Sequence, residues 1–535
     1  MNMKLKNIII YSLLVLFMVA SNGCVEEYLD FFPEDKMTSA NFPVNQDDMD
    51  LLLNGLYGQL CENSLYNEGF FAFGVLDGAT PNGYNWGGGI AIRKIGSGEL
   101  SATDGQIVNF RWTRGYAIIF RANYLLQALE TVELDESAKS MYEAEARFLR
   151  GVAYATLVES YGGVPIVLDA ISTEEARTVA RNTAEETWAQ ALADYDFAIA
   201  NLNVDAPQPG RATKGAAMAM KMRAQLYQGK FNEVITLADQ IIGLGKYSLF
   251  PSYEGLFQLE NENNQEVIWD IQYMQGENSQ GTRLDQFTGT GTGSWTRGTR
   301  YVPTEDLVNA YERIDGTPGK YFESEIDLDN PYDGWDPRLA VTCVVPGSYY
   351  LENYRFPNYL YPGGAYNHPG NRIKHLSTRK YREDDEASLA PTDQSDLNNI
   401  VMRYADVLLS KAEALIESGG NVEEAIALIN RIRTERDDVK MTPVPTGISR
   451  EEARAKLRHE RRIEFALEGL YWMDIKRWHK MDGFLNDVYP VEVRDHNGNI
   501  IETKFPDGYK EHFNLLPIPN NELSLNENLE QNPGW

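Results

Sequence analysis

Two pairs of segments with helical periodicity, one pair in each half of the chain, constrain the fold of this sequence most strongly. Apolar residues recur at helical spacing in 107–129 and 141–161, which are rich in Ala, Leu, Arg and Glu. A second pair of such segments, 403–418 and 422–436, is separated by a Gly-Gly turn at 419–420. We therefore expect a mainly α-helical protein in which helical hairpins form the scaffold.

Capping signals mark where some of these helices begin. Thr183 with Glu186, and Ser449 with Glu452, have the spacing of a capping box, in which each side chain satisfies a free backbone N–H of the first turn. Small residues in the second pair lie close to tetratricopeptide spacing, which lets two helices pack closely. Further helices are expected in 211–243, broken by a turn at 229–231, and in 449–467 and 471–480.

Between about 250 and 400 the sequence changes to long loops that are rich in Gly and Tyr. Only residues 266–273 alternate like a half-buried strand. Loops of this length in a compact protein are usually functional or disordered, and their aromatic content argues against disorder. We therefore expect the helices to be scaffold and the loops 276–301, 327–338 and 346–381 to supply the binding surface.

The net charge of −29, from 49 basic and 78 acidic residues, excludes some classes of partner. Nucleic-acid binding requires a basic stripe, and none is found. The same acidity disfavours electrostatic docking to an anionic membrane surface. Three cysteines are too few for a disulfide-stapled scaffold. Whether Cys61 and Cys343 pair is left open.

The N-terminus has the features of an export signal. Lys4 and Lys6 precede an uncharged apolar run over 8–20, which is shorter than the roughly 20 residues of a membrane-spanning helix. Small or polar residues 21–23 follow, and Cys24 comes next. This segment resembles the lipobox of bacterial lipoproteins, although Leu is usual where this chain has Ser21. We expect residues 1–23 to be a signal peptide and Cys24 to carry a lipid anchor.

The common signatures of catalysis are missing. There is no Gly-x-Ser-x-Gly elbow and no His-Glu-x-x-His pair, and the Gly-x-Gly-x-Gly run at 289–293 lacks the Lys-Ser/Thr and the helix of a phosphate loop. The 78 acidic residues guarantee many carboxylate pairs, so such pairs do not by themselves indicate a glycosidase. We expect no catalytic residue and no cofactor.

A metal site is possible in one place only. Asp327, Asp329, Asp333 and Asp336 could form a calcium site, because hard cations favour clustered carboxylates in a turn. The alternative is a solvated acidic loop, which the incomplete ligand pattern favours. We therefore assign no metal ligands.

Four blocks of residues stand out along the chain: 145–150 with 161–165, 403–406 with 412–414, 460–478, and 517–519 with the final 531–535. Together they resemble the SusD/RagB family of outer-membrane nutrient-binding lipoproteins, over nearly the whole mature chain. The resemblance implies a mostly helical fold with tetratricopeptide-like hairpins and a loop-rich binding face. It also implies a TonB-dependent transporter of the SusC type as partner, with the lipoprotein lying as a lid over the pore.

These blocks also divide the chain. We expect an N-terminal helical region over 24–245 and a C-terminal region over 246–535, with binding loops in about 276–381. The charged residues of the third block invite a catalytic interpretation, but opposite charges at helical spacing mostly form ion pairs. We therefore expect Glu460, Arg461, Glu464 and Arg477 to be structural.

Aromatic recognition remains as the chemistry of binding, because sugars have apolar C–H faces and polar rims. Trp86 and Trp295 lie in Gly-rich segments, where few local neighbours can bury a large ring. We expect them to form a ligand platform, and family members that bind glycans place aromatic rings in comparable loops. Weaker candidates, from the same combination of ring and polar rim, are Tyr84, Asn85, Tyr301 and Arg372. The helical Trp112, Trp188, Trp472 and Trp478 are expected in the core.

The sequence therefore predicts a cell-surface, lipid-anchored protein of the outer membrane that captures an oligosaccharide or polysaccharide. It would deliver this ligand unchanged to a SusC-like transporter. Two alternatives stay open: a family member that binds peptides or proteins, and a glycoside hydrolase. The sequence does not identify the glycan.

Overall fold

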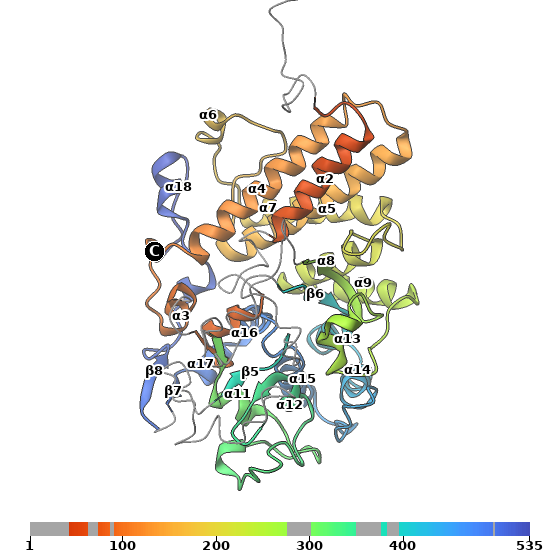
Figure 1. Cartoon of the computed structure of the whole chain (residues 1–535). Coiled ribbons are helices and arrows are strands. Elements are labelled where there is room, and N and C mark those ends of the chain that lie inside the picture. Colours follow the sequence, from red (N-terminus) through yellow and green to blue (C-terminus); the bar gives the residue numbers. More distant parts are fainter. Residues whose placement is uncertain are drawn as a thin grey trace, which may run out of the picture.

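The computed structural model describes residues 42–61, 73–85, 90–274, 301–348, 376–381, 395–495 and 498–535. The described chain is mainly helical and contains four two-stranded sheets, which confirms the predicted fold class (Figure 1). The helices of the N-terminal half are α2 (Gln46–Cys61), α3 (Ile90–Ser97), α4 (Ile107–Ala128), α5 (Glu136–Tyr161), α6 (Thr173–Ala176), α7 (Ala184–Asn201), α8 (Lys214–Tyr227) and α9 (Phe231–Gly243), with the 3-10 turn η2 (Phe73–Ala79).

The C-terminal half alternates short strands with helices. Its helices are α11 (Glu305–Ala310), α12 (Arg338–Thr342), α13 (Tyr404–Glu417), α14 (Val422–Thr434), α15 (Arg450–Glu464), α16 (Tyr471–Asp482), α17 (Leu485–Val488) and α18 (Asn520–Leu525). The strands of the chain are β1 (Gly83–Asn85), β2 (Val267–Ile271), β3 (Tyr301–Pro303), β4 (Cys343–Val344), β5 (Ser377–Thr378), β6 (Asn399–Arg403), β7 (Val491–Arg494) and β8 (Ile500–Lys504).

Long antiparallel helices form the upper part of the molecule in Figure 1, where α5 packs between α4 and α7. The Thr183–Glu186 capping box opens α7 as predicted. Helix α5 begins five residues earlier than expected, because the Asp135 side chain accepts a hydrogen bond from Ala138 N–H and caps it. Arg150 of the first family block joins α5 to α7 through two hydrogen bonds to Asp194, of 2.8 and 2.9 Å.

The predicted second hairpin is α13–α14, which turns at Gly419 with φ near +80°, a conformation that favours glycine. Helix α15 begins at the predicted Ser449–Glu452 capping box and packs on α13 and α14. Helix α13 also packs on α9, so the two helical blocks share one hydrophobic core.

Strand β2 differs from its predicted environment. The sequence indicated a half-buried strand, but four of its five residues are buried. It pairs with β6, and α8 packs on both strands, while the ring of Trp269 meets that of Phe148 edge-on at 4.9 Å. Both faces of the strand are therefore covered by protein.

The helical tryptophans behave as predicted with one exception. Trp112, Trp472 and Trp478 are buried in the core. Trp188 is only half-buried, because its indole ring lines a cavity instead of packing against a neighbouring helix on all sides. The prediction that Trp188 is a core residue was wrong.

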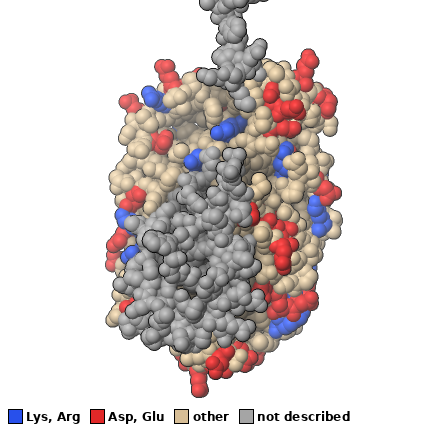
Figure 2. All heavy atoms as spheres, in the orientation of Figure 1, with Lys and Arg blue, Asp and Glu red and all other residues tan. Residues whose placement is uncertain are grey.

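Cys61 and Cys343 are both free thiols, which answers the question that the sequence left open. Cys343 is buried in β4, and the Cys61 thiol lies 3.4 Å from the backbone oxygen of Gln272 as a hydrogen-bond donor. Within the described ranges, no helix combines the length and apolar character needed to cross a membrane. Acidic side chains are spread along the edges of the face drawn in Figure 2, in keeping with the net charge of −29.

Candidate functional site

Three of the predicted site residues meet at one short antiparallel ladder. Strand β1 pairs with β3, so that Asn85 faces Tyr301 and Tyr84 faces Val302. Tyr84, Asn85 and Tyr301 are each only 1% exposed. The ladder thus joins two distant parts of the sequence that were both singled out as candidates for ligand binding.

The other predicted site residues, Trp86, Trp295, Arg372 and the lipidation residue Cys24, lie outside the described residues. Their position in the sequence relative to the ladder is still informative. Trp86 directly follows Asn85, the last residue of β1, and Trp295 precedes the first residue of β3 by six positions. The ends of both Trp-bearing segments are therefore fixed at the same end of one ladder.

The ladder is surrounded by buried polar atoms that have no hydrogen-bond partner in the part of the chain that the structure describes. They are the Asn85 side-chain oxygen and nitrogen, the Tyr301 hydroxyl, Asn82 Nδ2 and Asp77 Oδ1. A buried polar atom left unsatisfied costs about 1–3 kcal/mol, so such atoms normally bind water or a ligand. This group, which we call the polar cluster, has unused hydrogen-bonding capacity.

Two glycines allow the polar cluster to pack this closely. A Cβ on Gly78 would lie 1.9 Å from Asn85 Oδ1, and one on Gly83 would lie 2.5 Å from the Tyr301 ring. Neither distance is possible for a real Cβ, so a larger residue at either position would displace the Asn85 amide or the Tyr301 ring. These glycines therefore fix the approach of the Asn85 amide and the Tyr301 ring.

Hydrogen bonds from several elements hold the ladder in place. Arg462 Nε of α15 donates to Asn82 Oδ1 at 2.7 Å, and Lys504 Nζ of β8 donates to the Gly78 carbonyl at 2.7 Å. The ring of Tyr84 packs with Val302 and Val493, and the Arg93 guanidinium lies 5.4 Å from its centroid. The ladder is therefore a rigid base for the segments that leave it.

Asp77 is the titratable member of the polar cluster. Its Oδ2 accepts the backbone N–H of Leu467 at 2.8 Å, but burial dominates and raises its pKa from 3.8 to about 7. The folded protein therefore binds this proton more tightly than the unfolded chain does. The stability that Asp77 contributes is complete below about pH 3.8 and is lost as the pH rises towards 7.

We expect Asp77→Asn to remove this pH dependence, because Asn keeps an acceptor for Leu467 but does not titrate. The stability of the wild type relative to the variant should fall with a slope of at most about 1.4 kcal/mol per pH unit up to pH 7, and then level off. Urea unfolding of both proteins from pH 5 to 8 measures the difference. A constant difference across that range would contradict the assignment.

The charged blocks of the C-terminal half form a buried ion-pair cluster, as predicted, and not an exposed catalytic group. Glu464 accepts hydrogen bonds from Arg338 at 2.9 Å, Arg403 at 2.7 Å and Arg436 at 2.9 Å. All four side chains are at most 2% exposed. The cluster extends through Glu266, Glu460, Glu468, Arg433, Asp336 and Lys380.

The partners differ from those that helical spacing suggested. Arg461 pairs with Asp474 and Asp406, at 2.8 and 3.0 Å, and these lie on α16 and α13 instead of on its own helix. Of Glu460, Arg461, Glu464 and Arg477, Arg477 alone has an ion-pair partner on its own helix among the described residues, which is Asp474 three residues away. Most of these ion pairs therefore connect helices and fix their packing.

The acidic loop does not gather its carboxylates around one point. Asp336 is buried against Arg338 at 2.8 Å, and Asp327 accepts hydrogen bonds from Asp329 N–H and Asn330 within its own turn. Among the residues that the structure describes, no group of three His, Cys, Asp or Glu side chains is arranged to hold a metal ion. The calcium hypothesis therefore gains no support from these four residues.

Sequence reasoning missed Asp77 and Asn82. Both belong to a turn-like stretch that carries no motif, and their role depends on β3, which is far away in the sequence. The β-pairing that brings them to Tyr301 has no local sequence signal. An Asp and an Asn, each next to a glycine in the segment before Trp86, are the only signal that the sequence offers.

Comparisons with known proteins agree with this fold. Residues 265–535 match the family model described as "SusD family", and residues 27–226 match the one described as "Starch-binding associating with outer membrane". SusD-like protein P25 of Formosa agariphila is 26% identical over 98% of this chain and 97% of its own length.

Two solved structures show the same architecture. A SusD-like carbohydrate binding protein from Bacteroides fragilis has a TM-score of 0.77 and 27% identity, over 90% of this chain and 99% of that chain. Surface glycan-binding protein A from Bacteroides fluxus has a TM-score of 0.72 over 92% of this chain and 100% of its own, and its 21% identity shows the fold alone.

The two family models together cover both halves of the chain, and the first alone covers half of it. The family consists of non-catalytic glycan-binding proteins, and the second model describes an association with the outer membrane. The match confirms the resemblance inferred from the four sequence blocks. The chain belongs to the SusD family.

Proposed function

We propose that this protein captures an oligosaccharide or polysaccharide at the cell surface and delivers it unchanged to a SusC-like TonB-dependent transporter. The observation that carries the proposal is the β1–β3 ladder. It fixes the ends of the two Trp-bearing segments side by side, next to a polar cluster with unused hydrogen-bonding capacity. Trp86 and Trp295 form the apolar platform, and Tyr84, Asn85, Tyr301 and Arg372 supply or support the polar rim.

The chemistry of carbohydrates fits this combination. A sugar ring presents an apolar C–H face to an aromatic ring and hydroxyl groups to amides and charges. Asn85 offers both a donor and an acceptor that no described residue uses. Binding requires neither an activated nucleophile nor a proton shuttle, in agreement with the buried, ion-paired state of the charged blocks.

The relatives support the same ligand class. The Bacteroides fragilis structure is named a carbohydrate binding protein. Its sequence differs from this chain at about three-quarters of the positions, so it does not identify the glycan.

A glycan array tests the proposal directly. We expect the mature protein to bind at least one polysaccharide and to leave it uncut, with no new reducing ends as the protein concentration rises. A peptide library screened in the same array format distinguishes the glycan-binding proposal from the peptide-binding alternative. Release of reducing ends, or capture of peptides with no glycan bound, would overturn the proposal.

We also propose that the mature chain consists of an N-terminal region over 24–245 and a C-terminal region over 246–535.

We propose further that residues 1–23 are removed and that Cys24 carries the lipid that holds the protein on the outer membrane. Several acyl chains are needed for stable anchoring, because one chain binds only marginally. Cys24→Ala is expected to move the protein from the membrane fraction to the soluble fraction, as measured by fractionation and immunoblotting. Continued tight membrane association of that variant would contradict the assignment.

A further inference from the structure

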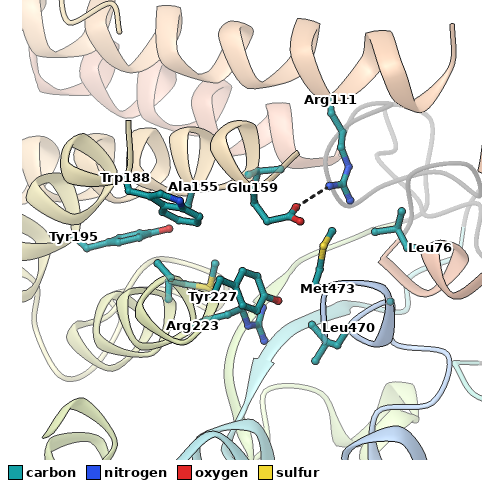
Figure 3. Close-up of a pocket in the computed structure, with 14 residues that line it drawn as sticks. Leu76, Arg111, Ala155, Glu159, Trp188, Tyr195, Arg223, Tyr227, Leu470 and Met473 are labelled. Atoms are coloured by element: carbon teal, nitrogen blue, oxygen red, sulfur yellow. Dashed lines mark ion pairs between the residues drawn. The ribbon is translucent and has the colours of Figure 1, made fainter. Parts of the chain in front are cut away.

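A second candidate site is a cavity between the N-terminal helices and α16, apart from the β1–β3 ladder (Figure 3). Its volume is about 70 Å³, several times the roughly 10–15 Å³ of accessible space that one water molecule requires. The turn η2 separates the two places, because Leu76 lines the cavity while its neighbour Asp77 belongs to the polar cluster.

Aromatic rings form one wall of the cavity and aliphatic side chains form the other. Figure 3 shows Trp188, Tyr195 and Tyr227 on one side, opposite Leu76, Leu470 and Met473. Trp188 and Tyr195 are two turns apart on α7, so both face the same way. The gap between the walls is thus suited to a flat or chair-shaped ring with an apolar face.

Arg111 and Glu159 supply the polar end of the cavity. Arg111 is 6% exposed, lies 3.5 Å from the Glu159 carboxylate and donates to Ser160 Oγ at 2.8 Å. Its Nε–H is buried and has no hydrogen-bond partner within the described ranges. Arg111 and Glu159 therefore bring a donor and an acceptor side chain to the lining of the cavity.

The charges at this end are already compensated. Glu159 pairs with Lys476 at 2.8 Å as well as with Arg111, and Arg223 of the cavity wall pairs with Asp406 at 2.8 Å. A charged ligand would find no unpaired counter-ion, whereas a hydroxyl can accept from Arg111 and donate to Glu159 at once. A long hydrocarbon chain would meet this polar end with nothing to satisfy it.

We infer that this cavity binds one neutral sugar ring, as a monosaccharide or as the end of a longer glycan. The inference rests on the proposed function for the ligand class but not for the site, because the cavity shares no lining residue with the ladder. It gives the protein a small-sugar site beside the proposed loop platform. For a single ring we expect a millimolar dissociation constant.

The test uses neutral methyl glycosides of glucose, galactose, mannose and xylose, measured by saturation-transfer NMR and titration calorimetry. Ala155→Phe fills the cavity from α5, and Trp188→Leu removes one of the three rings of its aromatic wall. Each should weaken binding of the glycoside at least tenfold. Ala189→Phe, at an exposed position next to Trp188 that does not line the cavity, is the matched control and should bind as the wild type does.

Three further measurements keep the outcomes separate. Thermal melts identify variants that fail to fold, and Trp188→Leu is expected to melt close to the wild type because its side chain is only half-buried. Polysaccharide binding in the same samples reports the proposed function by itself. The double variant Trp86→Ala, Trp295→Ala should lose polysaccharide and keep the glycoside.

Several results would overturn the inference. They are glycoside binding that survives Ala155→Phe, glycoside binding lost in the double Trp variant, and no binding of any neutral glycoside while polysaccharide still binds. Preferential binding of glucuronate or benzoate would reject a neutral sugar as the ligand class. If the wild-type protein binds no polysaccharide, that result would instead overturn the proposed function.

Discussion

Replacing Glu464 by alanine is expected to lower the free energy of unfolding by about 3–5 kcal/mol, because it leaves buried charges without a partner. Glu464 accepts hydrogen bonds from Arg338, Arg403 and Arg436 and is fully buried. Two further nitrogens of Arg436, Nε and Nη1, already have no partner in the described part of the chain. Urea unfolding at pH 7 measures the loss.

The pH dependence of this interaction has a definite sign. Burial alone would raise the pKa of Glu464, but Arg436, Arg403 and Arg338 outweigh it and hold the pKa well below the usual 4.5. The contribution of Glu464 is therefore complete above about pH 4.5 and is lost as the pH falls below that value. The surface variant Glu527→Ala is the control and should change stability by less than about 0.5 kcal/mol. Equal stability of the two variants would show that the ion-pair cluster contributes nothing.

Trp86→Ala and Trp295→Ala are each expected to weaken glycan binding about thirty-fold, the loss for truncating an anchoring aromatic that contributes about 2 kcal/mol. The expected melting temperature is unchanged, because a platform ring contributes to ligand binding and not to the packing of the core. Calorimetric titration with the glycan identified on the array, next to thermal melts, separates affinity from stability. A lowered melting temperature with intact binding would mean that these rings belong to the core.

Two control variants calibrate the measurement. Trp478 is 0% exposed and its indole N–H donates to Glu413 at 2.8 Å, so Trp478→Ala should cost about 3–5 kcal/mol of stability. Phe120 on α4 is 52% exposed, and Phe120→Ala should change neither affinity nor stability. Trp188 is not a suitable core control, because its indole ring lines a cavity.

Local signals in the sequence predicted the helices well. The capping boxes at Thr183 and Ser449 open α7 and α15, and the turn at Gly419 separates α13 from α14. These features depend on residues within one or two helical turns of each other, so they are visible without the fold. The start of α5 was missed because Asp135 caps it ahead of the apolar pattern.

Properties that depend on distant partners could not be predicted. The alternation of β2 indicated one exposed face, but α8 packs on the strand and four of its five residues are buried. Arg461 was expected to pair along its helix and instead reaches Asp406 and Asp474 on other helices. The polar cluster around Asn85 exists only because β1 pairs with β3, and no local sequence signal near Asn85 predicts that pairing.

The buried ion-pair cluster also bears on the order in which the chain can fold. Arg403 binds Glu266, which is 137 residues earlier, and Arg436 binds the same carboxylate across 170 residues. Such distant contacts form late, because loop closure must come first. During synthesis, which proceeds from the N-terminus, this cluster cannot be completed before α15 has been made, because Glu464 is the last residue of that helix.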